Sequence, residues 1–286
     1  MTGPRVDAHQ HFWDVRRFAY PWMPAELRRN FLPEDLAPVL RENRFDGAVT
    51  VQASTEDGES DWLLDLADQH SFMLGVVAWV DLTDPRLGDR LDQLQRRPKF
   101  RGVRHPVDDE PDNRWLLRAE VLRGLRELER RRIPFDLLVR PRHLPVVREL
   151  VDRVPSLPLV IDHIAKPPVA TGSLEGWAAD LEKVAQIGHM HVKLSGMVTE
   201  AGDRLAPEHL RPYLHHVMRL FPPERMMFGS DWPVCKLAGG MSWKRVLATF
   251  TQTHGPIPSP VRAEIIGATA VRFYGLKLQE WEPAAA

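Results

Sequence analysis

The chain has 286 residues, of which 43% are hydrophobic and 27% charged, and its formal net charge is −1. This balance gives no support to a nucleic-acid or membrane partner and leaves a small molecule as the expected one. The single cysteine, Cys235, excludes a disulfide framework and a cysteine-rich zinc site. The N-terminus has no signal-peptide pattern, and no apolar run approaches the ~18 residues of a membrane span, so we expect a cytoplasmic protein.

Short β-rich runs alternate with helical patterns along the whole chain. The first run begins at Val6, and others follow at 47–52, 73–80, 100–105, 134–139, 157–163, 191–195 and 225–231. The helical patterns between them include two that open on proline, at Pro33 and Pro207, and two with an expected serine N-cap, at Ser60 and Ser173. Two further helical patterns, 243–253 and 259–274, close the chain.

This alternation, without a break in composition, predicts one all-parallel α/β domain over residues 1–286. Closing eight parallel strands into a (β/α)8 TIM barrel removes both sheet edges, and the length fits a barrel of about 250 residues with additions. An open doubly wound sheet is the alternative. That fold usually has a glycine-rich turn after its first strand, whereas His-Gln-His-Phe-Trp follows here, so we predict the barrel.

One irregular stretch, from Phe18 to Leu32, is too apolar for an ordinary solvated loop. It contains Tyr20, Trp22 and Phe31. Such a segment either caps the mouth of the barrel or forms a contact within a homo-oligomer, and the sequence leaves both interpretations open.

Polar and aromatic residues stand at the ends of nearly all the predicted strands. In a barrel these ends meet at the active-site face. The residues in question are His9, His11, Gln52, Trp79, Arg104, His105, Arg140, His163, Ser195, Asp231 and Trp232. Histidines two apart on a strand lie on one face, so His9 and His11 can hold one divalent ion, grip one oxygen, or simply hydrogen-bond at a strand end. A third histidine and an aspartate at the same mouth favour a functional site.

Seven segments, in order, carry a more specific signal. They are 6–13 (VDAHQHFW), 101–105 (RGVRH), 135–140 (FDLLVR), 162–167 (DHIAKP), 193–196 (KLSG), 228–233 (FGSDWP) and 272–275 (RFYG). Together they resemble the amidohydrolase superfamily, in the branch of TIM-barrel hydrolases that includes sugar-acid lactonases such as L-fuconolactonase and L-rhamnonolactonase. The resemblance covers essentially the whole chain. It implies a hydrolase that opens a lactone ring.

The resemblance also implies roles for individual residues. It places His9, His11 and Asp231 as metal ligands, and His163 and Asp231 as catalytic residues. Binuclear relatives carry a bridging lysine or glutamate at strand four and a histidine at strand five. Here strand four ends in Arg104 and His105, and strand five (FDLLVR) has no histidine, with His143 a few residues beyond it, so a binuclear centre is not expected. One divalent ion, zinc or manganese, or none at all, is consistent with this pattern, because related lactonases include metal-independent members.

The chemistry expected of a lactonase can be assigned to these side chains. Asp231 is the candidate general base that takes a proton from water, and it can return that proton to the leaving alkoxide. His163, Arg104, His105 or a bound metal could stabilise the carbonyl oxygen as it gains negative charge. Substrate contacts are expected from Gln52, Trp79, Arg104, His105, Arg140 and Trp232, whereas Lys193 is expected in a structural ion pair.

Two other functions stay open from the sequence. The first keeps the barrel but changes the reaction to hydrolysis of a dicarboxylate lactone or to a metal-dependent decarboxylation. The second is a barrel that binds a sugar acid without turnover. The complete set of His9, His11, His163 and Asp231 counts against the second, because a binding module has no evident need for a base.

Overall fold

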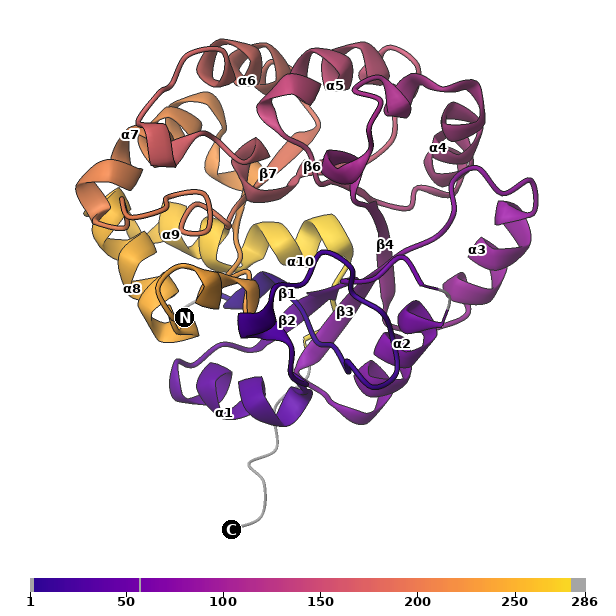
Figure 1. Ribbon diagram of the computed structural model, residues 1–286, viewed down its shortest axis with the longest axis horizontal. Coiled ribbons are helices and arrows are strands. Elements are labelled where there is room, and N and C mark those ends of the chain that lie inside the picture. Colours follow the sequence, from indigo (N-terminus) through magenta and orange to yellow (C-terminus); the bar gives the residue numbers. More distant parts are fainter. Residues whose placement is uncertain (1–2, 57, 279–286) are drawn as a thin grey trace.

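The computed structural model describes residues 3–56 and 58–278, and in it eight parallel strands form one sheet in the order β1 to β8 (Figure 1). The strands are β1 (Val6–Gln10), β2 (Gly47–Val51), β3 (Met73–Ala78), β4 (Phe100–His105), β5 (Phe135–Leu137), β6 (Leu159–Ile161), β7 (Met190–Leu194) and β8 (Met226–Phe228).

The two ends of this sheet meet, so that the sheet closes on itself. Gln10, the last residue of β1, and Trp232, which follows β8, form a parallel bridge. The N–H of Asp231 donates to the His9 carbonyl at 2.9 Å, and the N–H of His11 donates to the Trp232 carbonyl at 2.8 Å. The predicted (β/α)8 barrel is therefore confirmed, and the open doubly wound sheet is excluded.

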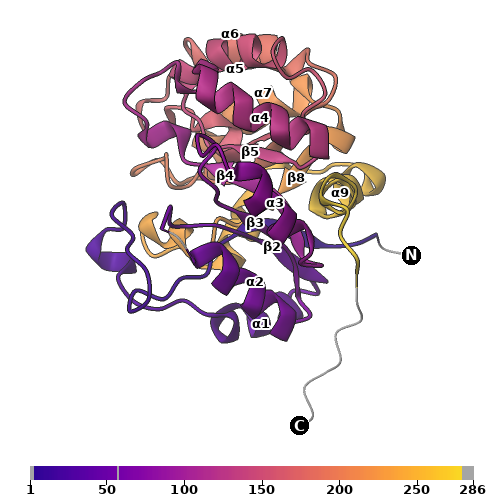
Figure 2. The ribbon, with the colours of Figure 1, turned by 90° about the vertical axis from the view of Figure 1, so that its right-hand side faces the viewer.

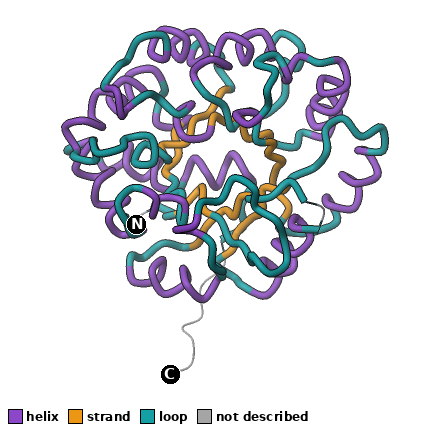
Figure 3. Tube along the Cα trace, in the orientation of Figure 1, coloured by secondary structure: helices purple, strands orange, loops and turns teal. Residues whose placement is uncertain are grey.

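Helices surround the ring of strands, as the tube in Figure 3 shows. Their bounds are α1 (Pro33–Glu42), α2 (Glu59–Gln69), α3 (Leu87–Gln95), α4 (Ala119–Arg131), α5 (Leu144–Val151), α6 (Trp177–Ala185), α7 (Pro207–Leu220), α8 (Trp243–His254), α9 (Ser259–Ile266) and α10 (Ala268–Tyr274). Within the described ranges, no helix combines the length and the hydropathy needed to cross a bilayer.

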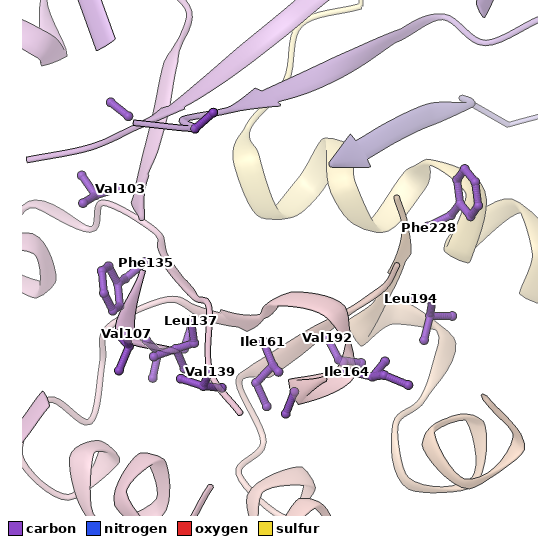
Figure 4. Close-up of a cluster of buried hydrophobic side chains, with 14 of the residues drawn as sticks. Val103, Val107, Phe135, Leu137, Val139, Ile161, Ile164, Val192, Leu194 and Phe228 are labelled. Atoms are coloured by element: carbon purple, nitrogen blue, oxygen red, sulfur yellow. The ribbon is translucent and has the colours of Figure 1, made fainter. Parts of the chain in front are cut away.

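The main hydrophobic core lies between the strands and the surrounding helices. Leu137, Ile161 and Val192 occupy neighbouring strands and are buried in this core. Figure 4 shows them pointing to the same side of the sheet, away from α10. Since alternate residues of a strand face opposite sides, the neighbouring positions on these strands are left to line the barrel interior.

A second, smaller core fills one end of the barrel. Val6 and Ala8 of β1 pack there together with Ala270 and Tyr274 of α10. In Figure 2, α9 and the N-terminus lie on the same side of the molecule, opposite the indigo loop that follows β1. Helix α10 thus plugs the N-terminal end of the barrel, and the loops after the strands surround the opposite end, the mouth.

Three local predictions were wrong. The helices after β2 and β6 begin one residue before Ser60 and four after Ser173, with Gly58 and Gly176 as their N-caps. The hydroxyl of Ser60 instead accepts the N–H of Trp79 at 2.9 Å. The pattern at 259–274 forms two helices, broken at Gly267, where a Cβ would lie 2.0 Å from the carbonyl oxygen of the crossing N-terminal segment.

The apolar stretch 18–31 lies at the mouth end, against the ends of β1 and β2. The rings of Tyr20 and Phe31 pack on Trp13. The indole N–H of Trp22 donates to the carbonyl of Ala53, just after β2, at 2.6 Å. This position agrees with the cap interpretation. A homo-oligomeric contact and the single-domain assignment for residues 1–286 stay predictions.

Candidate active site

A bulge in β1 directs its histidines into the barrel. Asp7 and Gln10 are three residues apart, but their partners on β2, Ala48 and Thr50, are only two apart. The extra residue breaks the alternation of the strand. As a result Asp7 faces outward, with its carboxylate accepting the indole N–H of Trp243 at 2.7 Å, while both histidines that follow contact groups of the barrel interior.

Three ligand atoms converge where β1 and β8 end. The Nε2 atoms of His9 and His11 are 3.2 Å apart. Oδ1 of Asp231 lies 3.4 Å from Nε2 of His11 and 3.9 Å from Nε2 of His9. Nδ1 of His11 lies 2.8 Å from the carbonyl oxygen of Val51. Because a carbonyl oxygen can only accept a hydrogen bond, Nδ1 of His11 carries the proton. In the neutral imidazole, the lone pair on Nε2 of His11 is therefore directed at the carboxylate.

This donor set fits a single divalent ion. Tetrahedral zinc with bonds of about 2.0–2.1 Å places its ligand atoms about 3.3 Å apart. The observed separations of 3.2, 3.4 and 3.9 Å among His9, His11 and Asp231 are close to that value. The Nε2 lone pair of His11 and the carboxylate of Asp231 also repel each other unless a cation or a proton lies between them. One competing cation is present, because Nη1 of Arg104 lies 3.4 Å from Nε2 of His9.

Beneath this cluster lies a fully buried charged network that the sequence analysis missed in part. Nζ of Lys193 lies 2.6 Å from Oδ2 of Asp136, 3.0 Å from Oδ1 of Asp162 and 3.1 Å from Nδ1 of His9. The hydroxyl of Tyr274 donates to Oδ2 of Asp136 at 2.8 Å. The structural ion pair expected for Lys193 is confirmed. The sequence does carry a signal for the partners of Lys193: Asp136 and Asp162 are each the single acidic residue in a mainly apolar strand segment.

His163 reaches the mouth through an unusual turn. The residue adopts a left-handed backbone (φ 54°) in the 3-10 turn Asp162–Ala165, directly after β6. Gly196 makes room for its ring, because a Cβ at that position would lie 2.5 Å from Cγ of His163. Nδ1 of His163 is 2.9 Å from the hydroxyl oxygen of Ser195, and its Nε2 is 3.9 Å from Oδ1 of Asp231. The side chain of His163 is thus fixed beside the candidate base.

The surroundings fix the charges of these groups. Burial lowers the pKa of His163 to about 4, so the ring is neutral near pH 7. Burial, followed by the charge of Lys193, holds the pKa of His9 well below its usual value. Burial alone would raise the pKa of Asp231, but His163 and His11 outweigh it and keep that pKa below its usual value. The site therefore presents an ionised carboxylate among neutral imidazoles.

Two of the expected substrate-binding residues join this cluster from its side. Arg104 is buried and donates to the side-chain oxygen of Gln52 from Nε, at 3.0 Å, and from Nη2, at 2.6 Å. Its Nη1 lies 3.3 Å from Oδ2 of Asp162. Gln52 thus positions the guanidinium of Arg104 beside His9.

The other expected substrate contacts are distributed differently. The indole N–H of Trp79 donates to Nδ1 of His105, whose Nε2 lies 2.7 Å from Glu110, so these residues form a separate cluster. The ring of Trp232 is buried against Phe12 and Phe31. Arg140 lies after β5 with 41% of its side chain exposed.

A closed parallel barrel with a histidine and aspartate cluster at its mouth defines a hydrolase-type site. The chain matches the amidohydrolase family over residues 6–276, and it belongs to that family. It is 37% identical to an L-fucono-1,5-lactonase of Burkholderia ambifaria, over 94% of this chain and 95% of the relative. It is 36% identical to an L-fucono-1,5-lactonase of Burkholderia multivorans, over 100% of this chain and 99% of the relative.

A solved structure agrees with this relationship. The chain superimposes on a crystal structure of an amidohydrolase from Burkholderia multivorans with bound zinc, with a TM-score of 0.90 and 35% sequence identity. The superposition covers 96% of this chain and all of the other. The family, the fold and the class of hydrolase are thereby established.

Proposed function

We propose that this chain hydrolyses the ring ester of a sugar-acid lactone, with L-fucono-1,5-lactone as the first substrate to test. The observation that carries the proposal is the ionised, buried Asp231 facing His11 and His163 at the barrel mouth. Such a group can take a proton from water. The full-length similarity to two L-fucono-1,5-lactonases supplies the substrate class.

In the proposed mechanism Asp231 acts first as a general base. A water molecule attacks the lactone carbonyl carbon while the carboxylate of Asp231 accepts its proton. The tetrahedral intermediate then collapses, and the carbon–oxygen bond to the ring oxygen breaks. Asp231 returns the proton to the leaving alkoxide, so that the products are the open hydroxy acid and the unchanged enzyme. A lactone carbonyl is more electrophilic than an amide carbonyl, so the activation required is modest.

Two neighbouring groups stabilise the charge that develops on the carbonyl oxygen. The hydroxyl of Ser195, donating to Nδ1 of His163, would hold the tautomer in which Nε2 carries the proton and can donate to that oxygen. The guanidinium of Arg104, fixed by Gln52, provides a positive charge nearby. Both groups are held by other side chains before substrate arrives, which is the arrangement that stabilises a transition state most effectively.

A divalent ion fits the same site. His9, His11 and Asp231 would hold it, and when bound it supplies Lewis acidity that lowers the pKa of water and polarises the carbonyl. We propose zinc, with manganese as the alternative. A cytoplasmic location and a homo-oligomeric assembly also remain proposals from the sequence.

The test is a pH-indicator assay of the purified protein against a panel of aldonolactones and carboxylated lactones, since each ring opening releases a proton. We expect turnover of L-fucono-1,5-lactone, and a loss of at least about 1,000-fold in kcat for Asp231→Asn. Asp152→Asn, which changes an exposed aspartate directly after α5, is the matched control. Comparable activity in Asp231→Asn and wild type would refute the mechanism, and an inactive wild type would refute the function.

A further inference from the structure

Four charged side chains form a second polar group at the mouth, which we call the mouth charge cluster. Asp108 follows β4, Arg140 follows β5, Lys166 follows β6 and Glu200 follows β7, so four consecutive loops contribute one charge each. Nζ of Lys166 lies 2.5 Å from Oδ2 of Asp108. Arg140 bridges the two acids, with its Nε 3.9 Å from Asp108 and its Nη1 3.8 Å from Glu200.

The hydrogen bonding of this cluster is incomplete. The two Arg140 contacts, at 3.8 and 3.9 Å, are beyond hydrogen-bond range. Only 4% of the Asp108 side chain is exposed. Its Oδ1 atom is buried and accepts no hydrogen bond from the residues that the structure describes. Buried carboxylate oxygens are normally satisfied. The cluster therefore has donors and an acceptor that a ligand could engage.

The cluster lies next to the reacting groups. The backbone N–H of Lys166 donates to the carbonyl of His163 at 2.8 Å. The charge of Lys166 contributes to lowering the pKa of Asp231. Burial raises the pKa of Glu200, and the charge of Asp231 adds to that effect. A ring whose carbonyl carbon lies beside Asp231 and His163 would extend its substituents toward these side chains.

The balance of charge indicates what kind of substituent fits. Two cations and two anions give a net charge of zero, whereas a carboxylated substrate would require surplus cations. A hydroxyl group both donates and accepts, so it is matched by side chains of both kinds. We infer that Asp108, Arg140, Lys166 and Glu200 form a subsite that binds the ring hydroxyls of a neutral, polyhydroxylated lactone. This inference rests on the proposed function and specifies its substrate.

The first experiment compares two substrates in an Arg140→Met variant. L-fucono-1,5-lactone carries ring hydroxyls, whereas δ-valerolactone has the same six-membered ester ring without them. We expect the ratio of kcat/KM for the hydroxylated over the bare ring to fall roughly 10- to 100-fold relative to wild type. Arg148→Ala, which removes an arginine from an exposed ion pair on α5, should leave both values unchanged. An unchanged ratio in Arg140→Met overturns the inference.

A second experiment does not depend on turnover. Calorimetry with L-fucose, a hydroxylated ring without the ester, measures the subsite directly. We expect wild type and Arg148→Ala to bind this probe equally, and Arg140→Met to bind it at least about tenfold more weakly. Arg140-dependent binding by a protein that opens no lactone would refute the proposed function and support the subsite. Binding that is absent in wild type, or equal in Arg140→Met, overturns the subsite.

Discussion

Gly229 lies directly against His9. A Cβ at position 229 would stand 2.6 Å from the Cβ of His9 and 3.2 Å from the Cβ of Ser195. None of these atoms is the far end of a flexible side chain, so an added methyl group has nowhere to go without moving a strand. The cluster of His9, His11 and Asp231 can assemble here only because β8 is followed by a residue without a side chain.

We therefore predict that Gly229→Ala lowers the free energy of unfolding by about 1–3 kcal/mol, as overpacking of a close-packed interior does. It should also lower kcat, because His9 must shift. Urea unfolding and the lactone assay measure the two effects. Gly188→Ala is the control, since a Cβ there has no neighbour within 4 Å, and it should change stability by less than about 0.5 kcal/mol. Equal stability of the two variants would contradict the steric argument.

Zinc binding tests the ligand set independently of catalysis. We predict that the protein, stripped with chelator, binds one zinc ion per chain, and that His11→Ala weakens this binding at least about 100-fold, since it removes one of three ligand atoms. Calorimetry and metal analysis provide the measurement. His70→Ala, at the end of α2, is the matched histidine control. Identical zinc affinity in His11→Ala and wild type would exclude this ligand set.

Lys193 compensates two buried carboxylates, Asp136 and Asp162, and is itself fully buried. We predict that Lys193→Met destabilises the fold by about 3–5 kcal/mol, because it leaves buried charge without a partner. Adding Asp136→Leu should recover part of that loss. Lys183→Met, in an exposed pair with Asp180, should cost no more than about 1 kcal/mol. The measurement is the midpoint of denaturant unfolding, and no recovery in the double variant would argue against the pairing.

Glu59 makes stability depend on pH. Burial raises the pKa of Glu59 from 4.5 to about 7. The backbone N–H groups of Ser54 and Ala53 oppose this shift, because they stabilise the charged carboxylate. The folded state thus holds this proton more tightly than the unfolded chain does. The protonated Glu59 therefore adds to the free energy of unfolding. This contribution is complete below pH 4.5 and is lost as the pH rises to about 7. We predict that Glu59→Gln reduces the difference in stability between pH 5 and pH 8, by up to about 3 kcal/mol.

Urea unfolding of both proteins at the two pH values gives the answer for Glu59. The exposed Glu149→Gln variant serves as the control and should follow wild type. A pH dependence in Glu59→Gln as steep as that of wild type would show that other groups are responsible.

The barrel could be predicted because alternation of strands and helices is a local pattern. Pro33 and Pro207 do open helices, and the β4 range was predicted to the residue. The Ser60 cap was wrong because the hydroxyl of Ser60 binds Trp79, which directly follows the next strand, β3. A tertiary contact of this kind leaves no trace in the residues around Ser60.

For the candidate site, the sequence predicts which residues stand at the ends of the strands, but not how their side chains contact one another. His9, His11, His163 and Asp231 do converge. The bulge in β1 could not be foreseen, although without it the two histidines would share the outward face of Asp7. Successive side chains of a strand face opposite sides, so His105 faces away from the interior that Arg104 faces. Trp79 binds His105 and is therefore also separate from the cluster of His9, His11 and Asp231.

The contact between Tyr274 and Asp136 joins residues 138 positions apart, and Tyr274 is the last residue of α10. Every strand can be synthesised before this hydroxyl exists, yet the acid that it binds also holds Lys193, which in turn holds His9. The part of the site at residue 9 is therefore completed by residue 274, which is synthesised after every strand. Premature termination that removes Tyr274 would leave Asp136 without this contact beneath the site, so that catalytic competence requires synthesis to proceed through α10.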